Sequence, residues 1–197
     1  MRTLLAVGWL FIGLAGLIFH FGPGQEKMEL DRVDSILDEA RQSAQDEKWN
    51  RAIEQFDQAL ALLPADRLND QRWVRLEKAK AQMMAKQLPI AREALAGLLD
   101  EIESEPTIDP KLKTETRSAL ASAQYYMTWL MRLEGLPKTE WEPEIESARQ
   151  NYRILYERAS EAGDDALAKR NREDLESAIR LARIDLKELQ GLPLPNQ

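Results

Sequence analysis

Apolar residues recur three or four positions apart along most of the chain, which is the spacing of one face of an α-helix. The first two stripes are Val33, Ile36, Leu37, Ala40 and Ala44, and then Trp49, Ala52, Ile53, Phe56, Ala59, Leu60 and Leu63. A short polar break at residues 46–48 separates them, and Pro64 closes the second because proline cannot continue the helical hydrogen bonds. So short a break predicts an antiparallel helix pair.

The pattern of this pair returns 39 residues later. The shift superposes Leu37 on Leu76, Ala40 on Ala79, Ala52 on Ala91 and Leu60 on Leu99. The turn of the second pair is predicted at Gln87 and Leu88, and Pro89 suits the first turn of the following helix. An internal repeat of this length is typical of helix pairs that stack on their neighbours.

Three further helices are predicted after the second pair. The first of them is expected to start at Asp109 and Pro110 and to end at Leu133, before a connection from Gly135 to Trp141. The second is expected to start at Pro143 and to end in a left-handed cap at Gly163. The third is expected to start at Asp164 or Asp165. The last helix is expected to run through Leu189, before a Pro-rich tail at 191–197. This gives about seven helices over residues 25–190: three pairs and a capping helix.

The first pair resembles the tetratricopeptide repeat. The residues that carry the resemblance are Ala52, Phe56, Ala59 and Pro64, at the spacing of the family, with Ala40 at the small position of the first helix. Small residues let paired helices approach, and the aromatic ring fills the space between pairs. The second unit keeps only part of this pattern, in Ala91 and Leu95. The resemblance implies an all-α fold, a short TPR-like α-solenoid, in which the first helix of each pair lines a groove that binds protein.

Carried over to this chain, the groove positions are Leu37, Arg41 and Gln45, and one repeat later Leu76, Lys80 and Met84. We add Tyr125, because Tyr126 and Trp129 share another face of their helix and are expected in the core. Two basic residues in register with a methionine suggest a pocket for an acidic or extended peptide. The alternative is that Arg41 and Lys80 only solvate a helix face.

The N-terminal segment from Leu4 to Phe21 contains no Asp, Glu, Lys or Arg. As a helix it would be about 27 Å long, close to the roughly 30 Å hydrocarbon core of a bilayer. Residues 1–24 therefore predict a transmembrane anchor and linker, with Leu4, Trp9, Phe11 and Phe21 in the membrane. Because Arg2 precedes the segment, we expect a cytoplasmic N-terminus and a C-terminal part exported across a bacterial inner membrane. The alternatives are a cleaved signal peptide, which gives a secreted protein, and a buried helix.

The composition agrees with long helices and excludes several chemistries. Ala, Glu, Lys, Leu and Arg make up about half of the chain. The chain has no Cys and one His, His20, which excludes disulfides, thiol nucleophiles and Cys-ligated metals. Arg2 is the only charged side chain before residue 22, so the net charge of −7 becomes −8 for the remainder, which does not favour nucleic acid. We expect no catalytic residue, metal, cofactor or small-molecule substrate.

Two acidic groups are the remaining candidates for chemistry. They are Glu101, Glu103 and Glu105, and Glu140, Glu142, Glu144 and Glu146. Such carboxylates could hold a cation or a basic partner, but carboxylates near a helix start also serve the helix dipole, which is the favoured interpretation.

Taken together, these features predict a membrane-anchored module for protein–protein interaction, an adaptor or assembly factor at the bacterial cell envelope. The alternative is a structural subunit of a larger complex or homo-oligomer, with Trp49, Trp73 and Trp141 in an interface. A third and least favoured interpretation is an enzyme that uses only carboxylates.

Overall fold

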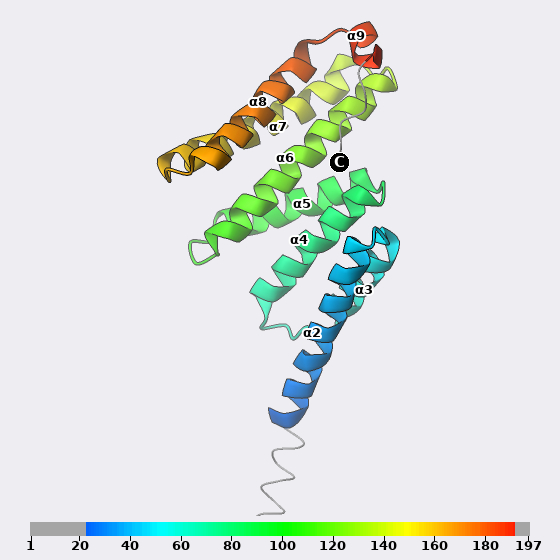
Figure 1. The fold of residues 1–197 in the computed structure, drawn as a ribbon, viewed down its shortest axis with the longest axis vertical. Helices are drawn as coiled ribbons and strands as arrows, with labels where there is room; N and C mark the ends of the chain where they lie inside the picture. The colour runs from blue at the N-terminus through cyan, green and yellow to red at the C-terminus, as the bar shows by residue number, and fades with distance from the viewer. Residues whose placement is uncertain (1–22, 192–197) are drawn as a thin grey trace, which may run out of the picture. The chain divides into compact units, whose positions relative to one another are not determined.

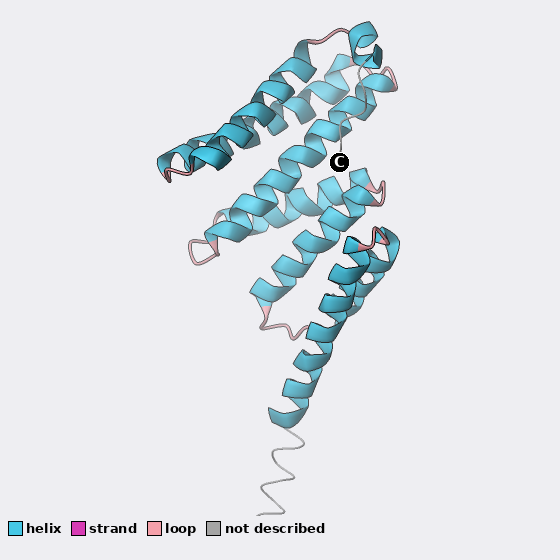
Figure 2. Cartoon of the chain, in the orientation of Figure 1, coloured by secondary structure: helices cyan, strands magenta, loops and turns pink. Residues whose placement is uncertain are grey.

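The computed structural model describes residues 23–191, and every regular element in this part is an α-helix (Figures 1 and 2). The elements are α2 (Pro23–Gln45), α3 (Trp49–Leu62), α4 (Leu68–Met84), α5 (Leu88–Glu103), α6 (Pro110–Leu133), α7 (Lys138–Glu161), α8 (Asp165–Arg183) and α9 (Leu186–Gly191). The predicted all-α fold is confirmed for the described residues. Their eight helices are compatible with a helical repeat fold.

The predicted membrane anchor at residues 4–21 lies outside the described residues, as does the tail from residue 192. Within the described range, none of the helices combines the length and the apolar character that a membrane span requires.

The chain divides after Leu68 into two compact units, each of which is described by itself. The first unit contains α2 and α3, which pack as an antiparallel pair. Ala40 of α2 and Ala52 of α3 are fully buried, and such small side chains let the two helices approach closely. The Ser43 hydroxyl donates a hydrogen bond of 2.7 Å to Gln55, so the buried polar groups between the helices satisfy one another.

The predicted repeat is present in the local geometry of the turns. The amide of Lys48 donates to the carbonyl of Ser43 (2.8 Å), and 39 residues later the amide of Gln87 donates to that of Gln82 (2.9 Å). Both bonds span five residues, as in a Schellman helix ending. Three of the four pairs that the shift superposes are buried in both copies: Leu37 and Leu76, Ala40 and Ala79, and Ala52 and Ala91. In the fourth pair Leu99 is buried and Leu60 is half-buried.

Four such turns each place one residue in the left-handed region of the backbone. These residues are Glu47 (φ 59°), Lys86 (φ 64°), Gly135 (φ 76°) and Gly163 (φ 73°). Glycine adopts this conformation without the clash of a Cβ atom, whereas Glu47 and Lys86 adopt it at a cost. The predicted left-handed cap at Gly163 is therefore confirmed.

The second unit contains two apolar clusters that share helix α6. The first joins α4, α5 and α6, and the second joins α6 to α7, α8 and α9. Leu112 and Leu120 point into the first cluster, and Ala121 and Trp129 into the second. Figure 1 shows α6, α7 and α8 side by side in this unit. Helix α6 thus has a neighbour on each of two sides.

The last predicted helix is divided in two, because a distant side chain caps it. The buried guanidinium of Arg132, on α6, donates to the carbonyls of Leu181 and Ile184 (2.5 Å for the latter) and stacks on the Trp141 ring at 4.7 Å. These bonds satisfy carbonyls that a continuing helix would have used, and α8 ends at Arg183. The prediction of one helix through Leu189 is therefore wrong, and α9 follows as a separate turn.

The start of α7 also differs from the prediction. The helix begins at Lys138, directly after Pro137, and Pro143 lies inside it. A proline at this sixth position removes one backbone hydrogen bond but leaves the first turn in place. That turn buries Trp141 in the second cluster, which favours the longer helix over the predicted connection. The predicted starts at Asp109 and Asp164 are confirmed, since each carboxylate accepts a hydrogen bond from the helix that follows.

The turn geometry predicts opposite effects for one substitution at two glycines. Gly163→Ala is expected to lower the free energy of unfolding by about 1 kcal/mol, because alanine is strained at positive φ. Gly97→Ala is expected to raise it by about 0.5–1 kcal/mol, since Gly97 lies inside α5 with open space beside it. Urea unfolding followed by circular dichroism measures both. Equal effects of the two changes would contradict the assignment of the cap.

Candidate functional site

The groove positions predicted in the first helices divide into buried and exposed ones. Leu37 and Leu76 are 8% and 0% exposed, so both belong to the core and neither lies on an open groove surface, which corrects that part of the prediction. Arg41 is exposed and pairs with Asp38 on its own helix at 3.0 Å, and Gln45 is exposed. The repeat gives the period of these positions, but it does not decide which of them face solvent.

Lys80 and Met84 line a cavity of about 430 Å³ between α4 and α6. We call it the methionine cavity, and its other lining residues are Met83, Leu88, Glu115, Ser118, Ala119, Ser122 and Tyr126. Glu115, Ser118, Ser122 and Tyr126 of α6 follow one another at three or four positions and therefore share one face of the helix, and Ala119 adjoins this face. A cavity of this volume is in the range of ligand sites in proteins.

Helix α6 lines the methionine cavity largely with small side chains, and α4 lines it with flexible methionine side chains. Ser118, Ala119 and Ser122 are small and half-buried, so a bound group can come close to the α6 backbone. Met83 and Met84 are unbranched side chains with polarizable sulfur, which adapt to apolar groups of different shape. The cavity is suited to an apolar side chain of a partner.

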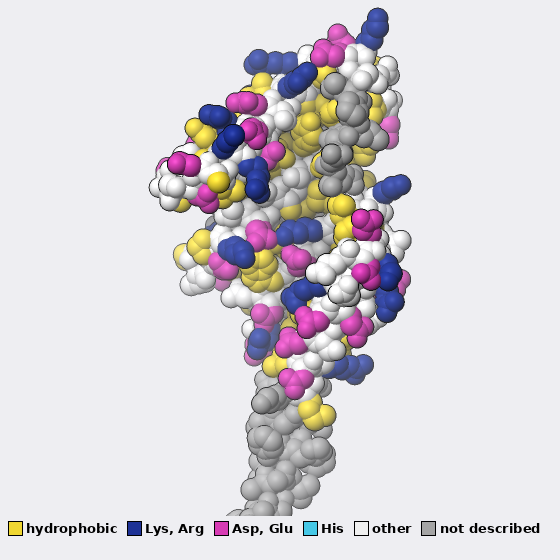
Figure 3. Space-filling model, in the orientation of Figure 1, with side chains coloured by type: hydrophobic (Ala, Val, Ile, Leu, Met, Phe, Trp, Pro, Cys, Tyr) yellow, Lys and Arg dark blue, Asp and Glu magenta, His cyan; other side chains and the backbone are white. Residues whose placement is uncertain are grey.

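The charges at the methionine cavity are paired within the chain. The Lys80 ammonium donates to Glu115 at 2.7 Å and to Glu77 at 3.2 Å. Burial alone would lower the pKa of Lys80, but the hydrogen bond to Glu115 and the charges of both carboxylates outweigh it and raise the pKa. Lys80 is therefore charged and already neutralised, which does not favour its predicted role with an acidic peptide. Figure 3 shows both signs of charge interspersed over the face it presents.

The tyrosines of α6 lie at two different cavities. Tyr126 lines the methionine cavity, whereas Tyr125 lines a smaller cavity of about 150 Å³ beside Trp129 and Leu189. The two rings meet edge to face at 5.6 Å. The prediction placed Tyr125 in the groove with Met84, and the structure places Tyr126 there. The sequence signal for Tyr126 is its position four residues after Ser122 on the same helix face.

A half-buried carboxylate on α8 lies close to these tyrosines. Burial raises the pKa of Asp174, against the charge of Arg170 on the preceding turn. Burial and then the charge of Asp174 also raise the pKa of Tyr126. The ionised form of Asp174 is therefore less stable in the folded chain than in water.

A second cavity of about 400 Å³ lies on the other side of the same α6 face. We call it the asparagine cavity, and it is lined by Pro110, Lys111, Thr114, Glu115, Ser118, Leu155, Leu167 and Asn171. It shares Glu115 and Ser118 with the methionine cavity. Asn171 of α8 is only 4% exposed, and its Nδ2 has no hydrogen-bond partner among the described residues. The sequence analysis missed this residue, because an Asn in an amphipathic helix carries no periodic signal.

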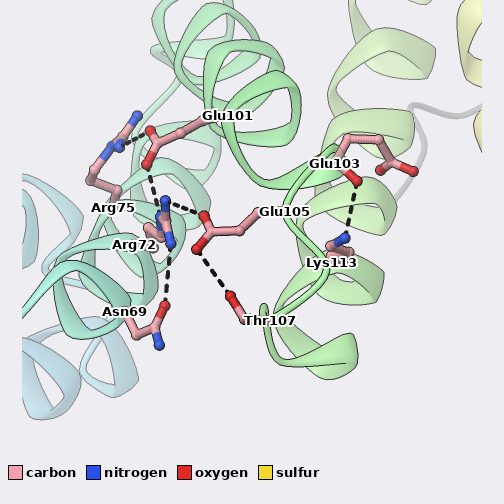
Figure 4. A network of polar contacts seen from close by, with 8 residues as sticks. All are labelled: Asn69, Arg72, Arg75, Glu101, Glu103, Glu105, Thr107 and Lys113. Atoms are coloured by element: carbon pink, nitrogen blue, oxygen red, sulfur yellow. Dashed lines mark hydrogen bonds and ion pairs between the residues drawn. The ribbon is translucent and has the colours of Figure 1, made fainter.

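The first acidic group is used to hold helix ends together (Figure 4). Glu101 accepts hydrogen bonds from Arg72 (2.8 Å) and Arg75 (2.6 Å), and Glu105 accepts another from Arg72 (2.8 Å). These bonds join the start of α4 to the end of α5 and the loop after it. Glu103 pairs with the buried Arg117 of α6.

The second acidic group lies along the first turns of α7. Glu142 pairs with Lys138 and Glu146 with Arg149 on the same helix, and Glu144 pairs with Arg92 of α5. Among the described residues, no group of three His, Asp or Glu side chains lies close enough together to hold a metal ion. Both acidic groups thus contribute to packing and to the ends of helices in this structure.

Comparisons with known proteins find no matching family model, no matching curated protein and no matching solved structure. The likeness to tetratricopeptide repeats is therefore carried by the residues of the first pair and by the repeated turns. The described residues form an all-helical fold that is compatible with helical repeats.

The two arginines that bind Glu101 give a test of the ion pairs in Figure 4, which join the start of α4 to the end of α5. Arg72→Met is expected to lower the free energy of unfolding by about 2 kcal/mol or more, because the Arg72 side chain is 8% exposed and holds two carboxylates. Arg75→Met is the matched control, since Arg75 binds the same Glu101 but is 41% exposed. Its loss is expected to cost less than about 1 kcal/mol. Urea unfolding measures the free energy of unfolding of both variants. Equal losses would argue against a stabilising role of the buried Arg72 ion pairs.

Asp174 gives a pH-dependent test. A carboxyl group whose pKa is raised by folding destabilises the fold at neutral pH, and this cost disappears as pH falls towards the ordinary value of 3.8. Asp174→Asn is therefore expected to raise the Tm at pH 7, with a smaller gain at pH 4. The control is Asp100→Asn at an exposed position of α5. A gain that is the same at both pH values would show that the charge of Asp174 is not its cause.

Proposed function

We propose that the protein is a membrane-anchored, TPR-like interaction module that binds a segment of a partner protein in the methionine cavity. It would act as an adaptor or assembly factor at the bacterial cell envelope. The observation that carries the proposal is the methionine cavity itself. It lies between the first helices of two successive pairs, α4 and α6, and contains Lys80 and Met84, which the resemblance assigns to the groove.

The chemistry of the cavity supports a protein partner. Two methionines, Leu88, Ala119 and Tyr126 offer apolar contact, and methionine-rich surfaces recur where proteins accept varied apolar side chains. The charged side chains at its edge, Lys80 and Glu115, already bind each other. Apolar contact is therefore the main source of affinity that this site offers.

The proposed anchor supports the envelope location. The apolar segment at residues 4–21 precedes α2 by one residue, so anchoring it would hold the helices close to the membrane. Confinement of this kind raises the effective concentration of the module near membrane-bound partners. If the segment is instead removed as a signal peptide, the same cavity would serve a secreted protein.

The alternative of an obligate structural subunit has less support. It expects Trp49, Trp73 and Trp141 in an interface, but Trp141 is 9% exposed and packs in the second cluster of its own chain. Trp73 is half-buried, packs against the first cluster and lies 5.9 Å from the Lys111 ammonium.

A photo-reactive amino acid placed at Met84 tests the proposed function. In cells that express the full-length chain, light is expected to produce a specific protein adduct from position 84. The matched control is the same amino acid at Ala94, an exposed position of α5 outside the cavities. Ala119→Trp, which fills the methionine cavity, is expected to abolish the adduct while circular dichroism stays unchanged. Adducts of equal yield at both positions, or adducts that survive Ala119→Trp, would refute the site.

A further inference from the structure

Helices α6 and α8 line two cavities together, and Asp174 lies between these cavities. Ser118 of α6 and Asn171 of α8 line the asparagine cavity. Further along both helices, Tyr125 and Ser177 line the smaller cavity of about 150 Å³. Asp174 follows Asn171 by three residues and precedes Ser177 by three. Its carboxylate therefore stands opposite the part of α6 that lies between Ser118 and Tyr125.

The face of α8 that carries Asp174 is otherwise packed. Asp174 follows Asn171 by three residues and precedes Ala178 by four, so the three share one face of the helix. Asn171 and Ala178 are 4% and 0% exposed, whereas Asp174 is only half-buried. The carboxylate thus marks an opening in a packed face, where a ligand from solvent can reach it.

Three tyrosines surround this opening. The Tyr152 hydroxyl lies 3.3 Å from the Ser122 hydroxyl, and Ser122 and Tyr126 line the methionine cavity. Burial raises the pKa of Tyr125, Tyr126 and Tyr152, and the negative charge of Asp174 raises all three further. The carboxylate is therefore close to all three hydroxyl groups, beside the methionine cavity.

The rings of Tyr125 and Tyr126 form a corner next to the carboxylate. Their planes are 80° apart, and their centroids are 5.6 Å apart. The face of an aromatic ring attracts a cation within about 6 Å of its centroid, and cages of such rings bind quaternary ammonium groups. Two rings at nearly a right angle, with a carboxylate beside them, offer the same contacts to a cation.

The charges around Asp174 leave room for an organic cation. Arg170 favours the ionised carboxylate, but burial outweighs this charge and raises the pKa of Asp174. Arg180, one and a half turns further along α8, pairs with Glu188 at 3.8 Å. A metal ion such as Ca²⁺ requires six to eight oxygen ligands, and the described residues bring no three metal-binding side chains together.

We propose that Asp174 and the rings of Tyr125 and Tyr126 bind a quaternary ammonium ion, whose apolar substituent extends into the methionine cavity. Tyr126 belongs to both parts, so one ligand can occupy them together. The flexible side chains of Met83 and Met84 adapt to the apolar substituent. This inference goes beyond the proposed function, because it names a small-molecule ligand, which the sequence alone does not predict, and requires no partner protein.

Titration calorimetry on the full-length chain in a non-ionic detergent tests the role of the ligand's charge. Choline is compared with its carbon analogue, in which a carbon atom replaces the charged nitrogen and the shape stays the same. Choline is expected to bind with a Kd of about 1 mM or below, and the uncharged analogue at least about tenfold more weakly. Equal binding of the two ligands, or no binding of choline, would overturn the proposal.

Variants of the corner test the residues. Asp174→Asn is expected to weaken choline binding about tenfold although it raises the Tm at pH 7, a combination that a damaged fold would not give. The matched control is Glu173→Gln, which removes the same charge from the adjacent, exposed position and is expected to leave the Kd unchanged. Tyr125→Phe keeps the ring and is expected to keep the affinity, whereas Tyr125→Leu is expected to weaken it several-fold. An unchanged Kd in Asp174→Asn, or equal Kd values for the two Tyr125 variants, would contradict the site.

Two further ligands test where the substituent lies and which source the cation has. Butyltrimethylammonium is expected to bind roughly tenfold more tightly than tetramethylammonium, and Ala119→Trp is expected to remove this gain by filling the methionine cavity. A gain that survives Ala119→Trp would refute the placement of the substituent. Glycerophosphocholine, the soluble part of a lipid headgroup, is expected to bind more weakly than choline, because its phosphate would lie near Asp174. Tighter binding of glycerophosphocholine would assign the site to a lipid headgroup and overturn the free cation.

Discussion

Helix α6 is packed on two sides, and this constraint determines what the rest of the second unit can do. Leu112 and Leu120 are committed to the cluster with α4 and α5, and Trp129 to the cluster with α7, α8 and α9. A helix that is covered on two sides has one remaining stripe, and on α6 this stripe carries Ser118 and Ser122. Both large cavities border that stripe, so the candidate site follows from the way the cores divide α6 between them.

Buried arginines fix the helix ends around this central helix. Arg72 and Arg117 hold Glu101 and Glu103 at the end of α5, and Arg132 holds the end of α8. Each guanidinium offers several donors in a plane, so one side chain can satisfy two or more groups from different helices. Removing such a residue leaves its partners unsatisfied, which explains why polar groups rather than further apolar contacts define these corners.

The sequence predicts local features well because they depend on neighbouring residues. Each of these features follows from residues within one turn of a helix boundary. They are the turns that recur after 39 residues, the caps at Asp109 and Asp164, and the turn at Gly163. The break between α8 and α9 does not, since it depends on Arg132, which lies about fifty residues earlier. The period likewise places Leu76 and Lys80 on the same helix, but only packing shows that the first is buried and the second lines a cavity.

Asn171 illustrates why a buried polar side chain escapes sequence patterns. A stripe of apolar residues predicts a core because every member gains free energy by burial, whereas a buried amide without a partner loses it. Its presence is therefore unfavourable for the folded chain alone. On α8, where Leu167 and Ala168 serve packing on neighbouring positions, an apolar residue at position 171 would bury at least as well.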